Sequence, residues 1–431
     1  VYIMAKRETT KTKKPKKTAK QKWAIFGKVI LGILIVISII AAVIATMNII
    51  SVKSINNFIS TVQTVEYENQ LKPTTNEKDG YYTFTTDNDF KVVQLSDVHI
   101  GAGFLSSKKD MMAVNAVEAM VKAEKPDLVV ITGDIGYPVP YQSGTLNNKN
   151  AAKIFANLME QMGVYWCLTY GNHDTEAYSY FDRADISAVY GNKEKYPHCL
   201  FQSGPEDVDG YGNYAVKVKN TAGKITQAIF MVDSHSYTDG DYFGALWKYD
   251  CIHKSQIDWY EKNVKAFTEE NNGEVPKSIM FFHIPLQEVQ KAYYEYRDND
   301  FKDTDRVKFM YGKAGETGKV VYASDKNEGM FDKIKELGST KGVFFGHDHT
   351  NSFSLMYDGI QLGYTYTVDY LAYFGIAQYG LQRGCSVMEI HPDGTYDRTL
   401  ENYYQDKYQS INKKEKVKME DYHSNLVSRE E

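Results

Sequence analysis

Short apolar runs alternate along the chain with segments in which apolar residues recur every three or four positions. Five of the runs have the composition of buried strands and occupy residues 91–99, 127–134, 164–174, 278–283 and 342–346. A run of this length with few charges is typical of a strand buried on both faces. Strands of this kind alternating with helices predict an α/β fold whose sheets are covered by helices.

Apolar stripes at helical spacing predict four helices between these strands. The stripes are Met111, Val114, Val117 and Val121; Ile154, Leu158 and Met162; Ile257, Tyr260, Val264 and Phe267; and Phe331, Ile334 and Leu337. Gly163 and Gly338 directly follow two of the stripes, and glycine is favoured just past the end of a helix. Ser255 and Asp258 have the spacing of a capping box, which predicts that the third helix begins there.

Four segments depart from this alternation. Residues 51–78 are mixed and polar, which predicts a stalk or linker, and residues 401–431 are expected to form a charged tail. Residues 176–222 and 287–328 are rich in tyrosine, glycine and charge. They are interpreted as long insertions over the rim of the sheet, with either a functional role or none beyond surface decoration.

The longest apolar run covers residues 29–50 and contains 22 residues without a charge. A helix needs about 20 apolar residues to cross a bilayer, so this run is predicted to be a transmembrane helix. A buried core helix and a cleaved signal peptide are the alternatives, although the apolar region of a signal peptide is usually about 7–15 residues long. Residues 1–28 carry ten Lys or Arg and one acid. This basic arm is expected to stay in the cytoplasm, which places the remainder outside a single-pass membrane anchor.

Charge and cysteine content narrow the function classes. Residues 1–28 carry +9 of the net charge of −5, so the rest of the chain carries −14. An acidic body disfavours nucleic-acid binding, although the basic arm could either touch nucleic acid or be a solvated tail. The four cysteines, Cys167, Cys199, Cys251 and Cys385, are scattered and indicate neither a zinc knuckle nor a disulfide scaffold.

Polar side chains gather where the five predicted strands end. These positions are Asp97 and His99, Asp134, Asn172 with His173 and Asp174, His283, and His347 with His349. The carboxyl ends of strands in open α/β sheets converge on one rim, where ligands bind. Imidazole and carboxylate are ligands for divalent metals, and this set is too large for one ion but sufficient for two.

The same blocks, in this order, resemble the signature of the calcineurin-like metallophosphoesterases. They are Asp97-x-His99, Gly133-Asp134, Gly171-Asn172-His173-Asp174, His283 and Gly346-His347-x-His349. The wider stretches "FFHIPL" and "FFGHDHTNSF" resemble the branch that holds plant purple-acid-phosphatase-like and fungal Dcr2-like phosphatases. The resemblance implies a four-layer α/β/β/α sandwich over residues 79–400.

The resemblance also implies a role for each residue. Asp97, His99 and His349 would bind one metal, Asn172, His283 and His347 a second, and Asp134 would bridge the two. His173 would stabilise or protonate the leaving oxygen, with Asp174 orienting it, and a metal-bridging hydroxide would be the nucleophile. Mn, Fe and Zn all suit this ligand set.

Three further residues near the blocks carry expectations. Tyr137 stands where purple acid phosphatases have an iron-binding tyrosinate, but those enzymes lack a histidine at the position of His99, so Tyr137 is expected to be a pocket or packing residue. Asp348 should point away from both metals, because side chains alternate along an extended backbone. Among the other histidines, His235 is the one to test for contact with the site.

The sequence thus predicts a membrane-anchored, extracytoplasmic phosphoesterase that acts on phosphate mono- or diesters. Its partners would be the phosphoester substrate and the lipid bilayer, the latter through residues 29–50, with no nucleic acid expected. The alternatives are a nucleotide hydrolase or nuclease of the same superfamily, and a catalytically silent cell-surface binding module.

Overall fold

A computed structural model describes residues 17–75, 80–373, 376 and 383–411. The chain divides into two compact units, Val1–Met47 and Asn48–Glu431, with the boundary inside helix α1 (Ala19–Ile59). In the first unit, this helix is apolar and exposed, and it is long enough to cross a membrane.

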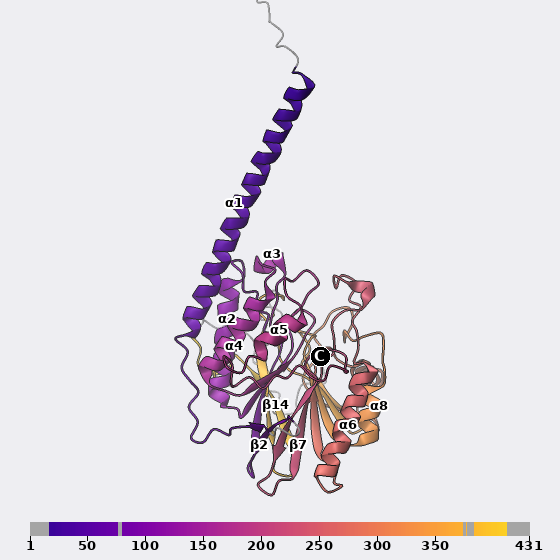
Figure 1. Cartoon of the computed structure of the whole chain (residues 1–431). Helices are drawn as coiled ribbons and strands as arrows, with labels where there is room; N and C mark the ends of the chain where they lie inside the picture. Colours follow the sequence, from indigo (N-terminus) through magenta and orange to yellow (C-terminus); the bar gives the residue numbers. More distant parts are fainter. Residues whose placement is uncertain (1–16, 76–79, 374–375, 377–382, 412–431) are drawn as a thin grey trace, which may run out of the picture. The chain divides into compact units, whose positions relative to one another are not determined.

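The second unit contains two β-sheets (Figure 1). The larger sheet has the order β1 (Thr74–Thr75), β2 (Tyr82–Thr85), β6 (Tyr214–Lys219), β7 (Ile225–Met231), β8 (Lys277–Phe281), β10 (Thr340–Phe345), β12 (Ile360–Tyr364), β11 (Ser354–Tyr357), β9 (Val307–Tyr311). The smaller sheet has the order β14 (Tyr396–Asn402), β13 (Gly384–Ile390), β3 (Phe90–Leu95), β4 (Leu128–Thr132), β5 (Trp166–Thr169). Both sheets mix parallel and antiparallel pairs.

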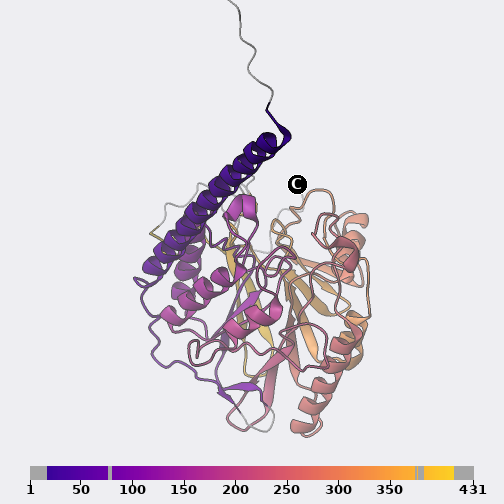
Figure 2. The ribbon, with the colours of Figure 1, turned by 45° about the horizontal axis from the view of Figure 1, so that its top comes forward.

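Helices lie on the outer side of each sheet, as Figures 1 and 2 both show. The smaller sheet is accompanied by α2 (Ser107–Glu124), α4 (Asn148–Met162) and α5 (Arg183–Tyr190), and the larger sheet by α6 (Lys254–Glu270), α7 (Gln287–Asp298) and α8 (Met330–Leu337). The short helices α3 (Pro140–Ser143) and η1 (Asp239–Asp241) belong to loops. The four-layer α/β/β/α architecture expected from the sequence is therefore confirmed.

Alternating side chains of the larger sheet explain how one chain fills two cores. In β8, Ile279 and Phe281 pack into the core shared with the smaller sheet, whereas Met280 packs into the core that also contains residues of α6 and α8. In β10, Phe344 faces the first core, and its neighbours Val343 and Phe345 face the second. The period of two along a strand thus buries both faces, which is why these runs are almost continuously apolar.

The predicted strands and helices form with shorter or shifted ends. Gly163 and Gly338 end α4 and α8 in the left-handed conformation, with φ of 69° and 67°, as expected. The start predicted for α6 was wrong. That helix begins at Lys254, and the side chain of Gln256 accepts the backbone N–H of His253 at 2.7 Å.

Residues 51–65 are not a free stalk. Helix α1 continues to Ile59, and Ile55, Ile59, Val62 and Val65 are all buried in the core. The Val65 N–H donates to the Met162 carbonyl at 2.8 Å, which fastens this segment to the end of α4. These four apolar residues are separated by four, three and three positions, which is helical spacing followed by a turn. The pattern was not recognised in the sequence because polar residues lie between them.

The two predicted insertions contribute regular structure as well as loops. Residues 176–222 include α5 and β6, and residues 287–328 include α7 and β9, so both extend the layers of the sandwich. The folded part also continues past residue 400, because β14 runs to Asn402 and Tyr403 and Tyr408 are buried. The remainder of the predicted tail, residues 412–431, lies outside the described residues.

Candidate metal centre

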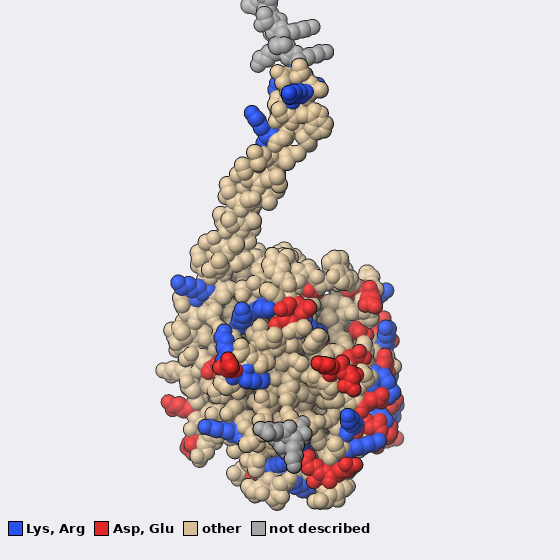
Figure 3. Space-filling view, in the orientation of Figure 1, with Lys and Arg blue, Asp and Glu red and all other residues tan. Residues whose placement is uncertain are grey.

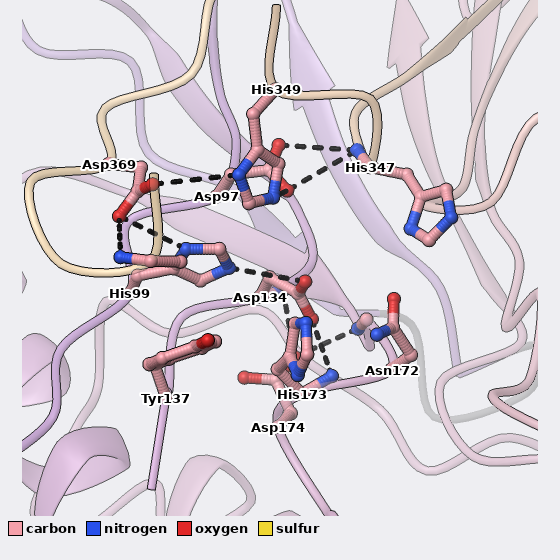
Figure 4. Close-up of polar contacts among 12 residues, drawn as sticks. Asp97, His99, Asp134, Tyr137, Asn172, His173, Asp174, His347, His349 and Asp369 are labelled. Carbon is pink, nitrogen blue, oxygen red and sulfur yellow. Dashed lines mark hydrogen bonds and ion pairs between the residues drawn. The ribbon is translucent and has the colours of Figure 1, made fainter. Parts of the chain in front are cut away.

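All seven predicted metal ligands converge on one buried site, where Figure 4 labels all of them except His283. Asp97, Asp134 and Asn172 follow β3, β4 and β5 of the smaller sheet, while His283 and His347 follow β8 and β10 of the larger one. The site therefore lies where the rims of two sheets meet, rather than on the rim of a single sheet.

The backbone bends sharply at the ligands themselves. Asp97, His99, Asp134 and His347 all have positive φ, between 52° and 76°. This conformation costs a non-glycine residue roughly 1–2 kcal/mol, and such strain concentrates at functional sites. Gly171 is required for another reason, since a Cβ there would collide with the Asp134 carboxylate.

Four of the ligands form a first group. One ligand atom from each of Asp97, His99, Asp134 and His349 lies within 4.8 Å of the others. His99 Nε2 is 3.3 Å from Asp134 Oδ2, and His349 Nε2 is 3.3 Å from Asp97 Oδ1. This group contains the residues expected to bind one metal, together with the expected bridge.

The second group surrounds the imidazole of His283. Its Nε2 lies 3.1 Å from Asp134 Oδ2, 3.2 Å from Asn172 Oδ1 and 3.3 Å from His347 Nδ1. Asp134 Oδ2 is thus within 3.3 Å of a histidine from each group. Asp134 is the side chain that joins the two groups.

Hydrogen bonds fix which atoms face inward. His283 Nδ1 is 2.7 Å from the Thr132 carbonyl and must donate to it, so in the neutral ring the lone pair is on Nε2. Asn172 Nδ2 donates to the Tyr237 hydroxyl at 2.8 Å, which turns its oxygen toward His283. Acceptor atoms therefore face one another, and His347 Nε2 is buried without a hydrogen-bond partner among the described residues.

The buried carboxylates of the site also favour the binding of cations. Burial alone would lower the pKa of His283, but the Asp134 carboxylate raises it to about 9. Burial likewise opposes the charged form of His99, yet Asp369 and Asp134 raise its pKa to about 9. The buried carboxylates thus attract positive charge, and a set of carboxylate, imidazole and amide ligands of this kind fits divalent transition metals.

Asp369 belongs to the site and was missed in the sequence. Its Oδ1 is 3.2 Å from His99 Nδ1, and its Oδ2 is 3.5 Å from His349 Nδ1 (Figure 4). It follows β12 and is fully buried. The signal was present, because Asp369 is the only charged residue between Asp358 and Arg383.

His173 lies beside the metal centre, and its carboxylate partner is not the predicted one. Its Nδ1 is 2.5 Å from Glu176 Oε1. Asp174 instead accepts the backbone N–H groups of Asp134, Gly136 and Gly171 at 2.8–2.9 Å. The role expected for Asp174, orienting His173, was therefore wrong: Glu176 orients the imidazole, and Asp174 fastens two ligand-bearing loops together.

Tyr137 is a pocket residue, as expected. Its ring centroid lies 4.8 Å from those of His99 and His173, while its hydroxyl donates to Gln142 Oε1 at 3.0 Å. Burial raises the pKa of this hydroxyl, which opposes a tyrosinate ligand. The side chain therefore shapes the wall of the site.

His235 does not reach the metal centre. Its Nε2 is 2.8 Å from Gln256 Oε1, and its ring stacks on His253 at 4.1 Å. Asp348 also contacts none of the ligands; it accepts the Tyr322 N–H at 3.2 Å and the Tyr364 hydroxyl. Alternation of side chains along an extended backbone, the reason expected for the direction of Asp348, is wrong, because the backbone at His347 is left-handed (φ 76°).

A cleft of about 370 Å³ opens onto the centre. His173, His347 and His349 lie on its wall, and Glu176, Glu316 and Asp348 supply acidic groups. Aromatic residues make up most of the remaining wall: Tyr137, Tyr141, Tyr178, Tyr237, Phe243, Trp247, Tyr249, Tyr322 and Tyr373. Among the described lining residues there is no Lys or Arg.

Two facing sheets whose rims present carboxylate, imidazole and amide groups to one buried site define a metal-binding α/β protein. Residues 90–351 match the calcineurin-like phosphoesterase family, and the chain belongs to that family. It is 30% identical to "Probable inactive purple acid phosphatase 14" of Arabidopsis thaliana, over 72% of this chain and 78% of the relative.

Two further proteins show similarity to this chain. The chain is 29% identical to "Phosphatase DCR2" of Saccharomyces cerevisiae, over 64% of this chain and 46% of the relative. A solved dimetal phosphatase from Danio rerio has 11% identity and a TM-score of 0.43, covering 71% of this chain and 94% of that structure.

Proposed function

We propose that this protein is a metal-dependent phosphoesterase that hydrolyses phosphate mono- or diesters at a two-metal centre. The observation that carries the proposal is the complete, buried donor set, in which acceptor atoms of two groups face one another across Asp134. Asp97, His99 and His349 would hold one ion, Asn172, His283 and His347 the other, and Asp134 both.

The bound ions would supply a water of lowered pKa and withdraw charge from the phosphoryl oxygens. The other functions fall to the chain itself. The Asp369 carboxylate lies at ion-pair distance from Nδ1 of His99 and of His349, while Nε2 of each ring faces the carboxylates of the centre. Glu176 holds His173 by Nδ1, which leaves Nε2 as the atom that can carry a proton to the departing oxygen.

The word "inactive" in the names of several plant relatives raises the alternative of a binding module without catalysis. A non-catalytic protein is free to lose ligands, yet here the two groups contain seven donors and a positioned imidazole. This completeness supports an active enzyme.

The test is hydrolysis of an aryl phosphate monoester and an aryl diester by the purified full chain, supplied in turn with Mn, Fe and Zn. We expect His173→Ala to keep its bound metal but to lose about 10²–10⁴-fold in turnover, the usual contribution of general acid catalysis. His198→Ala is a matched control, because His198 is also paired with a glutamate, Glu160, at 2.7 Å outside the site. Equal turnover of the His173 variant and the wild type would refute the proposed mechanism.

We also propose that residues 29–50 remain in the mature protein as a membrane anchor, with residues 1–28 in the cytoplasm and the catalytic unit outside. The supports are the uncharged 22-residue run and the basic residues before it. The mass of the protein extracted from membranes tests this directly: an intact anchor retains residues 1–50, whereas a cleaved signal sequence removes them.

A further inference from the structure

The cleft is bordered by apolar side chains that are exposed to solvent. Phe243 and Trp247 line the cleft and are 64% and 62% exposed, and Tyr141, on a separate segment, is 79% exposed. Tyr242 and Leu246, on the same loop as Phe243, are 65% and 60% exposed without lining the cleft. Large exposed apolar groups clustered beside a binding site are typical of a surface that contacts a protein or a membrane.

We call the exposed side chains of Tyr141, Tyr242, Phe243, Leu246 and Trp247 the rim of the cleft. The chain enters the second unit next to the part of this rim that contains Tyr141. Asn48, its first residue, donates to the Gly144 carbonyl at 3.1 Å and accepts the Phe104 N–H at 2.8 Å. Gly144 ends α3, the short helix that carries Tyr141 into the cleft wall. The next two residues, Ile49 and Ile50, are 68% and 62% exposed.

The proposed anchor would bring this part of the rim close to lipid. If residues 29–50 span the bilayer as proposed, only a few residues of chain separate the surface around Asn48 from it. Trp and Tyr are the residues that favour the boundary between lipid and water, because one end of each is apolar and the other polar. The occupant that fits the rim is therefore a lipid surface.

The charge of the cleft agrees with this. Its described lining contains acidic groups and no Lys or Arg, so a soluble polyanion such as a nucleotide would find no cationic side chain there. Charged side chains gather on other parts of the folded unit, whereas the edge that carries α3 is largely without them (Figure 3). A phosphate ester on a lipid brings few charges and a large apolar body.

We infer that the substrate is a phosphoester embedded in a bilayer, and that Tyr141, Tyr242, Phe243, Leu246 and Trp247 form the surface that rests on that bilayer. The inference depends on the proposed phosphoesterase function and on the proposed membrane anchor, and it specifies the substrate class of the enzyme. Hydrolysis adds one water across the P–O bond: the phosphorus gains its hydroxyl, the departing alcohol takes a proton from His173, and the remaining proton of the water restores His173.

The first experiment compares substrates for the full chain reconstituted, with Mn, into phosphatidylcholine vesicles. The vesicles contain 10% phosphatidic acid as the monoester or 10% phosphatidylglycerol as the diester, and dihexanoyl analogues and an aryl phosphate serve as soluble substrates. We expect kcat/KM at least tenfold higher for one of the embedded lipids than for its soluble analogue. Tyr242→Ser combined with Leu246→Ser should lower the lipid rate about tenfold and leave aryl phosphate hydrolysis within twofold of wild type.

Val275→Ser is the matched control, because Val275 is 45% exposed just before β8, at the end of that strand away from the metal centre. It should change neither rate. A lipid preference that survives in the Tyr242/Leu246 variant, or no lipid preference at all, overturns the inference. Faster hydrolysis of nucleotides than of either lipid also overturns it, and would assign the aromatic wall to base stacking.

A second experiment does not depend on activity. Quenching of tryptophan fluorescence by brominated phosphatidylcholine is compared between Trp23→Phe and the double variant Trp23→Phe/Trp247→Phe, since Trp166 and Trp259 are buried. We expect quenching that is lost in the double variant, whereas equal quenching in both refutes membrane contact by the rim. If no ester is hydrolysed with any metal, the proposed function fails, whereas hydrolysis of soluble esters alone removes only the lipid assignment.

Discussion

Asp369 offers the sharpest test of how the metal centre is held. Its carboxylate accepts the backbone N–H groups of Leu371, Ala372 and Tyr373 at 2.7–2.8 Å and also faces the Nδ1 atoms of two ligand histidines. Burial alone would raise the pKa of Asp369, but the two imidazoles hold it well below its usual range, so the group is an anion. Asp369→Asn removes that charge without changing the shape of the side chain.

The size of the effect follows from these contacts. Oδ1 accepts the Leu371 and Ala372 N–H groups and Oδ2 accepts the Tyr373 N–H, so in either orientation the NH₂ group of the amide takes the place of an acceptor of backbone N–H. One hydrogen bond to a charged group is lost, which costs about 1.5–3 kcal/mol of stability. Loss of a carboxylate that orients metal-ligating histidines typically lowers metal affinity about 10–100-fold. At about 1.4 kcal/mol per tenfold, both effects have the same scale.

The assay is competition with a chromophoric chelator for Zn or Mn, paired with urea unfolding of the metal-free protein. Asp348→Asn is the control, since Asp348 is also buried near the site but contacts none of the ligands. Burial raises the pKa of Asp348 to about 7, so an amide resembles the protonated form already present at neutral pH. We expect this variant to bind metal within threefold of wild type. Equal affinity for all three proteins, or equal losses in both variants, would refute the assigned role of Asp369.

Three further outcomes are expected. Glu176→Gln should lower turnover about tenfold, because a charged hydrogen bond to His173 is lost, and should leave the free energy of unfolding unchanged. Asp174→Asn should lower the free energy of unfolding by about 1.5–3 kcal/mol. Equal unfolding midpoints for the two variants would contradict this. Ile55→Ala should cost about 2–5 kcal/mol in urea unfolding, while a free stalk would show no change. Burial raises the pKa of the Cys251 thiol from 9.0 to about 11. At pH 8 its reaction with an aromatic disulfide reagent should therefore be about a hundredfold slower in the native protein than after unfolding, and the native rate should rise with pH. A native rate equal to the unfolded rate would contradict this.

The sequence predicted the layers well because local periodicity determines which faces are apolar. The runs before Asp97, Asp134 and His283 have the composition of strands buried on both faces, and the ends of those strands located the ligands. The split into two sheets could not be predicted in the same way. It depends on pairings such as β3 with β13, whose residues are almost 300 positions apart.

Two features of the site needed tertiary contacts to be found. Adjacent position favoured Asp174 as the partner of His173, but the loop after β5 turns so that Glu176 reaches the ring and Asp174 faces the backbone of the neighbouring loop. Asp369 lies about twenty residues beyond His349, after β12, and only the packing of that strand beside β10 brings it to the centre. Spacing along the chain carries no information about such contacts.

Because the predicted ligands come from both sheets, the metal centre would connect the two layers of the sandwich. A cation held by Asp97 and His349, or by Asn172 and His283, would tie the smaller sheet to the larger one, and by linkage any ion that binds only the native state adds to its stability. At a hundredfold excess over Kd, one such ion adds about 2.7 kcal/mol. Loss of a single ligand would then weaken the cohesion of the sandwich as well as its chemistry, so a descendant that abandons catalysis must replace that cohesion by other packing between the sheets.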